Sequence, residues 1–125
     1  MTKKAKILLI EDDPILSSMY ETEFEIYGFD VVVASSGKEG IKVSKKVKAD
    51  LVFLDLLLGD MDGLDVLREM KKDPKSRDLK VIVLTNLTKK GLEEDCLNAG
   101  ALAYFVKSSL IPKEVVKKAK EFINR

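Results

Sequence analysis

The chain has 125 residues, of which 46% are hydrophobic and 34% are charged, as expected for one globular domain with a single core. Its 22 basic and 21 acidic residues leave a net charge of +1, so no overall field predicts binding to nucleic acid or to an anionic membrane. The absence of histidine excludes histidine-based metal sites and Ser-His-Asp triads, and the single cysteine, Cys96, excludes an internal disulfide. The first apolar run, residues 7–10, is too short for a signal peptide or a membrane span, so we expect one cytoplasmic domain over residues 1–125.

Strand and helix signals alternate from the N-terminus. The apolar run 7–10 predicts a buried strand, and Asp13 before Pro14 is typical of the start of a helix, which we expect to reach about Tyr27. The β-branched run 30–34 predicts a second strand.

The same alternation continues through the middle of the chain. Ser36 followed three residues later by Glu39 matches the capping-box pattern and predicts a second helix, ending at about Val47. The unbroken apolar run 51–54 predicts a third strand, buried on both faces. A third helix follows, with one apolar face formed by Leu64, Leu67 and Met70.

Two more pairs complete the chain. Residues 81–84 predict a fourth strand, and Thr88 is the predicted cap of a fourth helix that ends before Gly100. Residues 103–106 predict the fifth strand, and Pro112 begins the last helix. The lysines of this helix are predicted to form a solvated face, because no aromatic platform for nucleic-acid bases accompanies them.

Five alternations of strand and helix predict an α/β fold with a parallel sheet covered on both faces. At this length we expect a flavodoxin-like (βα)5 doubly wound sheet of five strands, in the order 2-1-3-4-5. Such sheets bind ligands outside the carboxyl ends of their strands, at the switch point between the first and third strands. The residues that follow positions 10 and 54 are therefore the first candidates for a functional site.

Polar side chains stand at the ends of four predicted strands: Glu11 and Asp12, then Asp55, Thr85 and Lys107. Three neighbouring carboxylates repel one another and raise the pKa of at least one of them, unless a cation joins them. Mg²⁺ is the expected cation, because it takes oxygen ligands and can share a phosphate oxygen. With a lysine charge and a threonine hydroxyl nearby, Asp55 is the predicted nucleophile for phosphoryl transfer, forming an aspartyl phosphate.

In this order, and each at a strand end, these features resemble the receiver domains of two-component response regulators. The motifs that carry the resemblance are residues 9–13, 50–55, 61–63, 83–85 and 104–107, which together span nearly the whole chain.

The resemblance implies a phosphoprotein of a two-component system or phosphorelay, in which Asp55 accepts a phosphoryl group from a sensor histidine kinase or a phosphotransfer protein. It implies that Asp12, Asp55 and the carbonyl oxygen of Leu57 hold Mg²⁺, with Glu11 reaching the metal through water. Such a domain assists its own phosphorylation and dephosphorylation and is not otherwise an enzyme.

The resemblance also implies a switch. Thr85 would move toward the phosphoryl group and Tyr104 would rotate inward behind it. The surface of the fourth helix, the fifth strand and the fifth helix would then change its protein partner, or form a homodimer, as one of two populated states. We expect no direct nucleic-acid or membrane partner, and the sequence leaves open whether the chain is a stand-alone regulator or part of a longer one.

Four positions depart from the family pattern. Gly59 stands where proline is common, Asn86 where alanine is usual, and Ala103 where an acidic residue is frequent. Ser108 stands where proline is usual and often follows a cis bond, so we expect a trans bond between Lys107 and Ser108.

Two apolar residues, Leu57 and Leu87, are predicted to flank the approach to Asp55 and to slow hydrolysis of an aspartyl phosphate by water. Asp60, Asp62 and Asp65 are predicted to be solvated residues of a loop and a helix start.

Three other functions are associated with parts of this pattern. An aspartyl-phosphate hydrolase would need a second acid just after the nucleophile, where the apolar Leu57 stands, and a cap domain, for which the chain is too short. A flavodoxin-like cofactor binder would place the acidic residues 11–13 against a phosphate. A pseudo-receiver, which binds partners without phosphorylation, remains the alternative.

Overall fold

The computed structural model describes residues 3–125, so the first two residues of the predicted domain lie outside the described residues. It contains one parallel five-stranded sheet in the order β2-β1-β3-β4-β5, which confirms the predicted topology. The strands are β1 (Lys6–Ile10), β2 (Asp30–Ala34), β3 (Leu51–Leu54), β4 (Val81–Thr85) and β5 (Ala103–Val106). The helices are α1 (Pro14–Ile26), α2 (Gly37–Ser44), α3 (Gly63–Lys72), α4 (Leu92–Asn98) and α5 (Pro112–Ile123), with a 3-10 turn, η1, at Lys107–Ser109.

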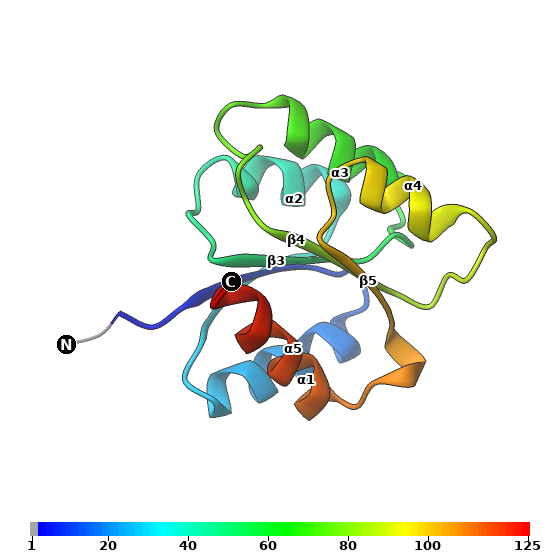
Figure 1. Ribbon diagram of the computed structural model, residues 1–125. Coiled ribbons are helices and arrows are strands. Elements are labelled where there is room, and N and C mark those ends of the chain that lie inside the picture. The colour runs from blue at the N-terminus through cyan, green and yellow to red at the C-terminus, as the bar shows by residue number, and fades with distance from the viewer. Residues whose placement is uncertain (1–2) are drawn as a thin grey trace.

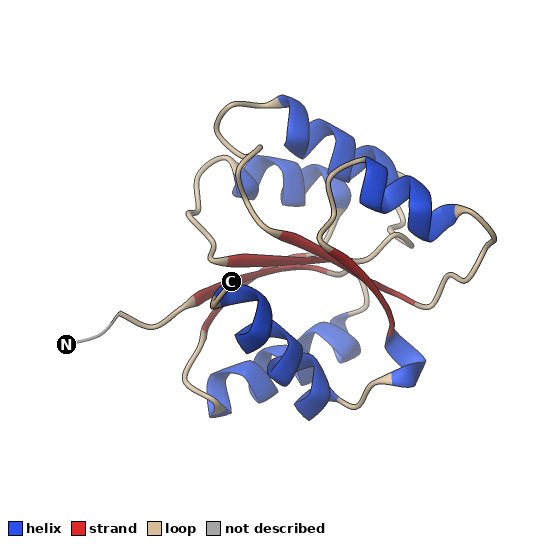
Figure 2. Ribbon diagram, viewed as in Figure 1, coloured by secondary structure: helices blue, strands red, loops and turns tan. Residues whose placement is uncertain are grey.

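Two helical layers enclose the sheet. Figure 1 shows α1 and α5 on one face and α2, α3 and α4 on the other, and Figure 2 shows the strands between these layers. Because successive strand residues point to opposite faces, each strand contributes to two separate cores. In β1, Leu8 and Ile10 pack toward the α2–α4 layer, whereas Ile7 and Leu9 pack toward α1 and α5. This burial on both faces is why the strands are apolar throughout.

The first helix begins where the sequence predicts. A carboxylate oxygen of Asp13 accepts hydrogen bonds from the amides of Ile15 and Leu16, at 2.9 and 3.2 Å. The helix ends at Ile26, and Tyr27 follows as its C-terminal cap, close to the predicted end. Gly28 then takes a positive φ of 88°, which reverses the chain toward β2 and is easiest for glycine.

The second helix is shorter than predicted, ending at Ser44 instead of about Val47. Its last turn tightens: the amide of Lys45 bonds to the carbonyl of Lys42, three residues back. Ser36 caps the helix through the amide of Glu39, at 3.1 Å, but the Glu39 carboxylate contacts Ser35 and not the amide of Ser36. Only half of the predicted capping box therefore forms.

The fourth helix also differs from its prediction, because Thr88 does not cap it. The helix begins at Leu92, after Gly91, whose φ of 85° interrupts the helical backbone. A residue in that conformation cannot continue a right-handed helix, so the segment from Thr88 to Gly91 is a loop. Within residues 3–125, no helix combines the length and the apolar character needed to cross a lipid bilayer.

The single thiol should be unreactive in the folded protein. Cys96 is fully buried in the core beneath α4, and burial, aided by nearby Asp95 and Asp62, raises its pKa to about 11. At pH 8 we expect thiol reagents to label it at least about 100-fold more slowly than in urea, because the thiolate is the reactive form. Labelling of the native protein as fast as of the unfolded protein would contradict this burial.

Candidate functional site

Adjacent strands deliver three acidic side chains to one edge of the sheet. Ile10, the last residue of β1, lies beside Leu54, the last residue of β3, so Glu11 and Asp55 follow in step. The amide of Asp55 bonds to the carbonyl of Ile10 at 3.1 Å, which carries the pairing up to the site. Asp12 comes next in the chain and is exposed.

A lysine joins two of these carboxylates. The ammonium group of Lys107 donates hydrogen bonds to Oε1 of Glu11 and to Oδ2 of Asp55, the latter at 2.7 Å. The three residues are buried, with exposed fractions of 9%, 2% and 5% respectively. Lys107 reaches this point because it follows β5 directly and begins the turn η1.

Burial and charge set the protonation of this group. Burial raises the pKa of Glu11, and the neighbouring Lys107 offsets only part of that effect. Burial alone would lower the pKa of Lys107, but its bonds to Asp55 and Glu11 outweigh burial and raise it. The lysine is therefore charged at neutral pH, and it lies between two acids that would otherwise repel each other.

The arrangement also fits a divalent cation. Carboxylate oxygens of Glu11, Asp12 and Asp55 lie within 4.8 Å of one another. A cluster of hard oxygen donors with one exposed member suits Mg²⁺, which binds one or two carboxylates and keeps several waters. Glu11, Asp12 and Asp55 are thus brought together as the sequence predicts, while their roles as ligands remain predictions.

The loop after β3 contacts the same carboxylates through its backbone. The amide of Leu57 donates to Oδ1 of Asp55, and the amide of Gly59 donates to Oδ2 of Asp12, each at 3.1 Å. Leu57 is 54% exposed, and its predicted use of a carbonyl oxygen for the metal remains a prediction. Its side chain and that of Leu87 line one surface hollow of about 370 Å³, formed mainly by the loop that follows Asp55.

The two predicted switch residues, Thr85 and Tyr104, both form hydrogen bonds with the backbone of Leu87. Oγ1 of the buried Thr85 accepts a hydrogen bond from the amide of Leu87 at 3.4 Å. The hydroxyl of Tyr104 donates to the carbonyl of Leu87 at 2.5 Å, and burial, as the main cause, raises the pKa of that hydroxyl. Movement of Thr85 or Tyr104 would therefore act on the loop between β4 and α4 through Leu87.

Two of the departures from the family pattern prove to be partners. The described residues contain no cis peptide bond, so the bond between Lys107 and Ser108 is trans, as predicted. The freed amide of Ser108 donates to Oδ1 of Asn86 at 2.9 Å. Proline at position 108 would have no amide donor and alanine at position 86 would have no side-chain acceptor, so this hydrogen bond requires both replacements. The sequence could not show this pairing, because the two residues are 22 positions apart.

One aspartate has a role that its sequence context does not predict. Asp60, predicted to be merely solvated, accepts hydrogen bonds from the amides of Gly37 and Lys38 at 2.8 and 2.9 Å. These bonds lower the pKa of its carboxyl group. Asp62 caps α3 through the amide of Leu64, at 2.9 Å, and Asp65 is exposed in the first turn of that helix.

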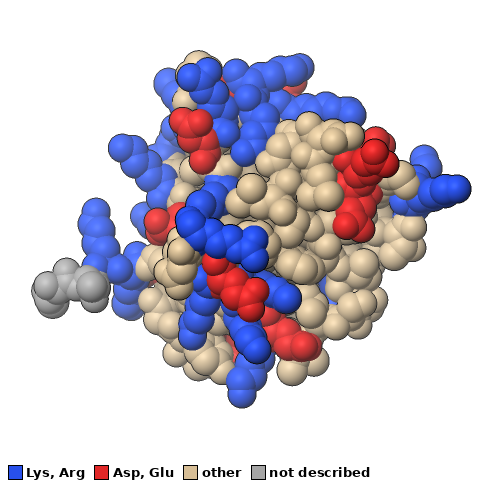
Figure 3. Space-filling model, in the orientation of Figure 1, with Lys and Arg blue, Asp and Glu red and all other residues tan. Residues whose placement is uncertain are grey.

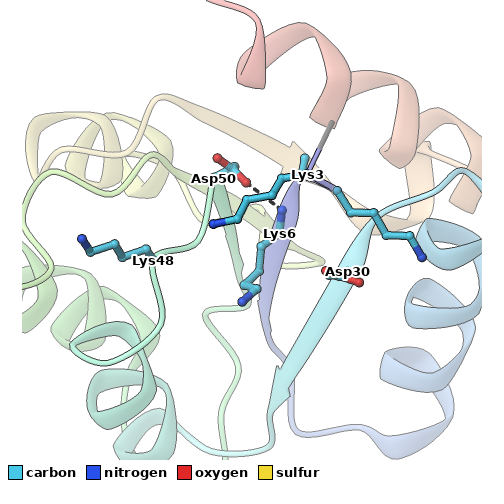
Figure 4. A pocket seen from close by; sticks show the side chains of 7 residues that line it. Lys3, Lys6, Asp30, Lys48 and Asp50 are labelled. Atoms are coloured by element: carbon cyan, nitrogen blue, oxygen red, sulfur yellow. Dashed lines mark hydrogen bonds between the residues drawn. The ribbon is translucent and has the colours of Figure 1, made fainter. Parts of the chain in front are cut away.

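A hollow of about 440 Å³ lies where β1, β2 and β3 begin, at the other edge of the sheet, and we assign no function to it. Its lining includes four lysines and two aspartates, but Figure 4 shows the side chains of Lys6 and Lys48 pointing in different directions. One carboxylate oxygen of Asp50 accepts a hydrogen bond from the amide of Lys6, at 2.7 Å.

The face that carries α5 mixes basic with acidic side chains and shows no continuous basic surface (Figure 3).

Comparison with known proteins agrees with this geometry. The family described as the response regulator receiver domain matches residues 7–120. A probable transcriptional regulator, ycf27, from Porphyridium aerugineum is 33% identical over 123 residues, or 98% of this chain and 50% of that protein. The chain spans half or less of the length of the transcriptional regulators that it matches first.

Solved structures show the same fold. A CheY-like receiver domain protein from Methanospirillum hungatei JF-1 has a TM-score of 0.88 and 28% identity, covering 98% of this chain and 95% of that one. The receiver domain of the sensor histidine kinase PA1611 from Pseudomonas aeruginosa PAO1 has a TM-score of 0.87 and 25% identity, covering 98% and 100%. That structure has a magnesium ion coordinated in its active site cleft. From its sequence match and its fold, the present chain belongs to the response regulator receiver domain family.

Proposed function

We propose that this receiver domain is a phosphoacceptor switch in which Asp55 takes the phosphoryl group. The observation that carries the proposal is the buried ammonium group of Lys107, held between Glu11 and Asp55 beside the exposed Asp12. A structural ion pair needs one acid for one lysine, whereas this edge gathers three acids. The excess of carboxylate is what a divalent cation and a phosphoryl group require together.

In the proposed reaction, a carboxylate oxygen of Asp55 attacks the phosphorus of a phosphohistidine or of a small acyl phosphate. A bond forms between that oxygen and phosphorus, the bond to the donor nitrogen or oxygen breaks, and the donor leaves with the electron pair. Mg²⁺, when bound by Glu11, Asp12 and Asp55, would neutralise charge on the phosphoryl oxygens. Lys107 would exchange its bond to Asp55 for one to a phosphoryl oxygen while keeping Glu11 as a partner.

The switch would start at Leu87. If Thr85 turns to donate its hydroxyl proton to a phosphoryl oxygen, its Oγ1 would move away from the amide of Leu87, and the hydrogen bond that it now accepts from that amide would break. Tyr104, which holds the carbonyl of Leu87, would then be free to change position. This would shift the population of conformations of the surface formed by α4, β5 and α5, provided that phosphate binds one conformation better.

The proposed phosphodonor is a sensor histidine kinase or a phosphotransfer protein, and the proposed output is a protein partner or a second copy of this chain at the surface of α4, β5 and α5. We place the reaction in the cytoplasm, where such donors and Mg²⁺ are available. The chain assists its own phosphorylation and dephosphorylation and is not proposed to turn over any other substrate.

Incubation with Mg²⁺ and acetyl phosphate tests this function. We expect intact-mass measurement to show one added phosphate, absent when EDTA replaces Mg²⁺ and removed by hydroxylamine, which cleaves acyl phosphates. Protein that stays unmodified under all donor conditions, including a panel of phosphorylated kinases, would contradict the proposal and favour the pseudo-receiver alternative.

Hydrolysis of the aspartyl phosphate is predicted to be slow. Leu57 and Leu87 line the hollow formed by the loop that follows Asp55, and neither side chain offers a polar group to orient an attacking water. We expect a half-life of minutes or longer, and about tenfold faster loss in Leu57→Asn, whose amide could orient water. The matched control is Leu97→Asn, which makes the same substitution at an exposed leucine of α4. A half-life of seconds in the unchanged protein would refute the prediction.

A further inference from the structure

The loop after β3 touches the candidate site at two points. Its Leu57 amide bonds to Asp55, and its Gly59 amide bonds to Asp12. These bonds fix one oxygen on each of two carboxylates that the metal is expected to use. The orientation of Asp12 is especially dependent on this loop, because Asp12 is exposed and outside the ion pairs of Lys107.

The loop is itself held from the other side by Asp60. Both carboxylate oxygens of Asp60 are used, one for the amide of Gly37 and one for the amide of Lys38. These are the first two amides of α2, which have no partner inside the helix. The contact joins segments 22 and 23 residues apart and fastens the loop to a helix.

The helix is a firm support for the loop. Gly40 of α2 lies so close to the side chain of Ile10 in β1 that a Cβ there would meet it at 2.7 Å. At the helix start, a Cβ on Gly37 would overlap the side chain of Met61 in the loop. The helix start and the loop are therefore closely packed as well as joined by the hydrogen bonds of Asp60.

We propose that Asp60 is a positioning residue: by fastening the loop to α2, it sets the amides of Leu57 and Gly59 and hence the carboxylates of Asp55 and Asp12. Asp60 is not one of the clustered carboxylates and is not proposed as a ligand of the metal or of the phosphoryl group. Its expected effect is on metal affinity, which rests on the proposed function, and on the order of the loop, which does not.

The first test is amide hydrogen exchange without metal. Asp60→Ala should speed exchange of the amides of Gly37, Lys38 and Gly59 by about tenfold or more, because the loop loses its attachment. Asp60→Asn keeps one oxygen acceptor and should lie between Asp60→Ala and the unchanged protein. Ser36→Ala removes the other side-chain cap of α2, at the amide of Glu39, and should leave the Gly59 amide unchanged.

The second test separates positioning from general destabilisation. In Asp60→Ala, the Mg²⁺ concentration for half-maximal phosphorylation by acetyl phosphate should rise about 3- to 10-fold, less than the roughly 10- to 100-fold typical for direct partners of metal ligands, because Asp60 acts on the ligands only through the loop. The maximal rate at saturating Mg²⁺ should change less than about twofold. Asp65→Ala, an equal charge change at an exposed position on α3, should alter neither quantity.

The outcomes distinguish the two proposals. Unchanged exchange at Gly59 in Asp60→Ala would overturn the positioning role, whatever the protein does with phosphate. Faster exchange in Asp60→Ala with no phosphorylation of the unchanged protein would support the loop attachment and count against the proposed function. An equal shift of half-saturation in Ser36→Ala and Asp60→Ala would overturn the positioning role and assign the effect to helix stability.

Discussion

The Asp55→Asn variant is expected to incorporate no phosphate under conditions that phosphorylate the unchanged protein. The amide of asparagine carries no charge and is a poor nucleophile, so the loss should be complete and not graded. The conformation of the site should be retained, because an asparagine oxygen can still accept a hydrogen bond from the amide of Leu57. Intact mass after incubation with Mg²⁺ and acetyl phosphate provides the measurement.

Two variants bracket this result. Asp65→Asn makes the same substitution at an exposed helix position, and its phosphorylation should equal that of the unchanged protein. Asp12→Asn should still be phosphorylated, but only at about 10- to 100-fold higher Mg²⁺, because it loses one charged metal ligand and keeps the nucleophile. Phosphate on the Asp55→Asn variant at the level of the Asp65→Asn control would contradict the assignment.

Lys107→Met is expected to give the largest loss of folding stability. Methionine keeps most of the volume but leaves the buried Glu11 and Asp55 without their cation. Removing one partner from buried charges typically costs about 3–5 kcal/mol, and exposed Asp12 lets water and cations relieve part of it, so we expect about 2–4 kcal/mol at pH 7.5 in EDTA. Urea unfolding measures this difference.

The loss should depend on pH in a defined direction. Burial already raises the pKa of Glu11 above its ordinary value of 4.5, and loss of Lys107 raises it further. An acid with a raised folded pKa stabilises the fold below its unfolded pKa and loses that contribution as pH rises through the folded pKa. The raised pKa of Lys107 means that the unchanged protein keeps the lysine's contribution at every pH below about 10.5. The two proteins should therefore differ most at neutral pH and least near pH 4.5.

The effect of Mg²⁺ on stability is a second test of the same residues. A divalent cation can take over from the missing ammonium group, so saturating Mg²⁺ should stabilise Lys107→Met more than it stabilises the unchanged protein. The same variant should be phosphorylated much more slowly, because no point charge meets the phosphoryl oxygens. A stability loss that is equal at pH 5 and pH 7.5, and unaffected by Mg²⁺, would show that the carboxylates do not depend on Lys107.

The strands and their order could be predicted because burial on both faces demands unbroken apolar runs. Residues 7–10 and 51–54 are of this kind, and each ends abruptly at an acid. Since parallel strands end at one edge, the meeting of Glu11 and Asp55 follows from topology alone. The bridge made by Lys107 is a matter of side-chain reach and needed the structure.

Local signals were less decisive where neighbouring residues compete with them. Thr88 is a good capping residue, but Gly91, with its positive φ, decides where α4 begins. Ser36 and Glu39 match a capping box, yet the Glu39 carboxylate contacts Ser35. In the first case a neighbour occupies the predicted position, and in the second the predicted side chain bonds to a neighbour of its expected partner.

The contacts between distant segments could not be read from spacing. Asp60 stands in a segment typical of a solvated loop, and only in the folded chain does it accept hydrogen bonds from the first amides of α2. The pairing of Asn86 with Ser108 is similar, because each looks like an isolated departure until both are seen together. Residues that act at a strand end can therefore be predicted from the sequence, whereas those that act through a partner far away in the chain cannot.

The most direct test of the central claim is to locate the phosphate on the chain. Borohydride reduces an aspartyl phosphate to homoserine, so treatment of the phosphorylated protein followed by peptide mass spectrometry marks the residue that carried the group. We predict homoserine at position 55, dependent on both Mg²⁺ and the phosphodonor. Homoserine at another acidic residue, or phosphate that survives both borohydride and hydroxylamine, would contradict the account.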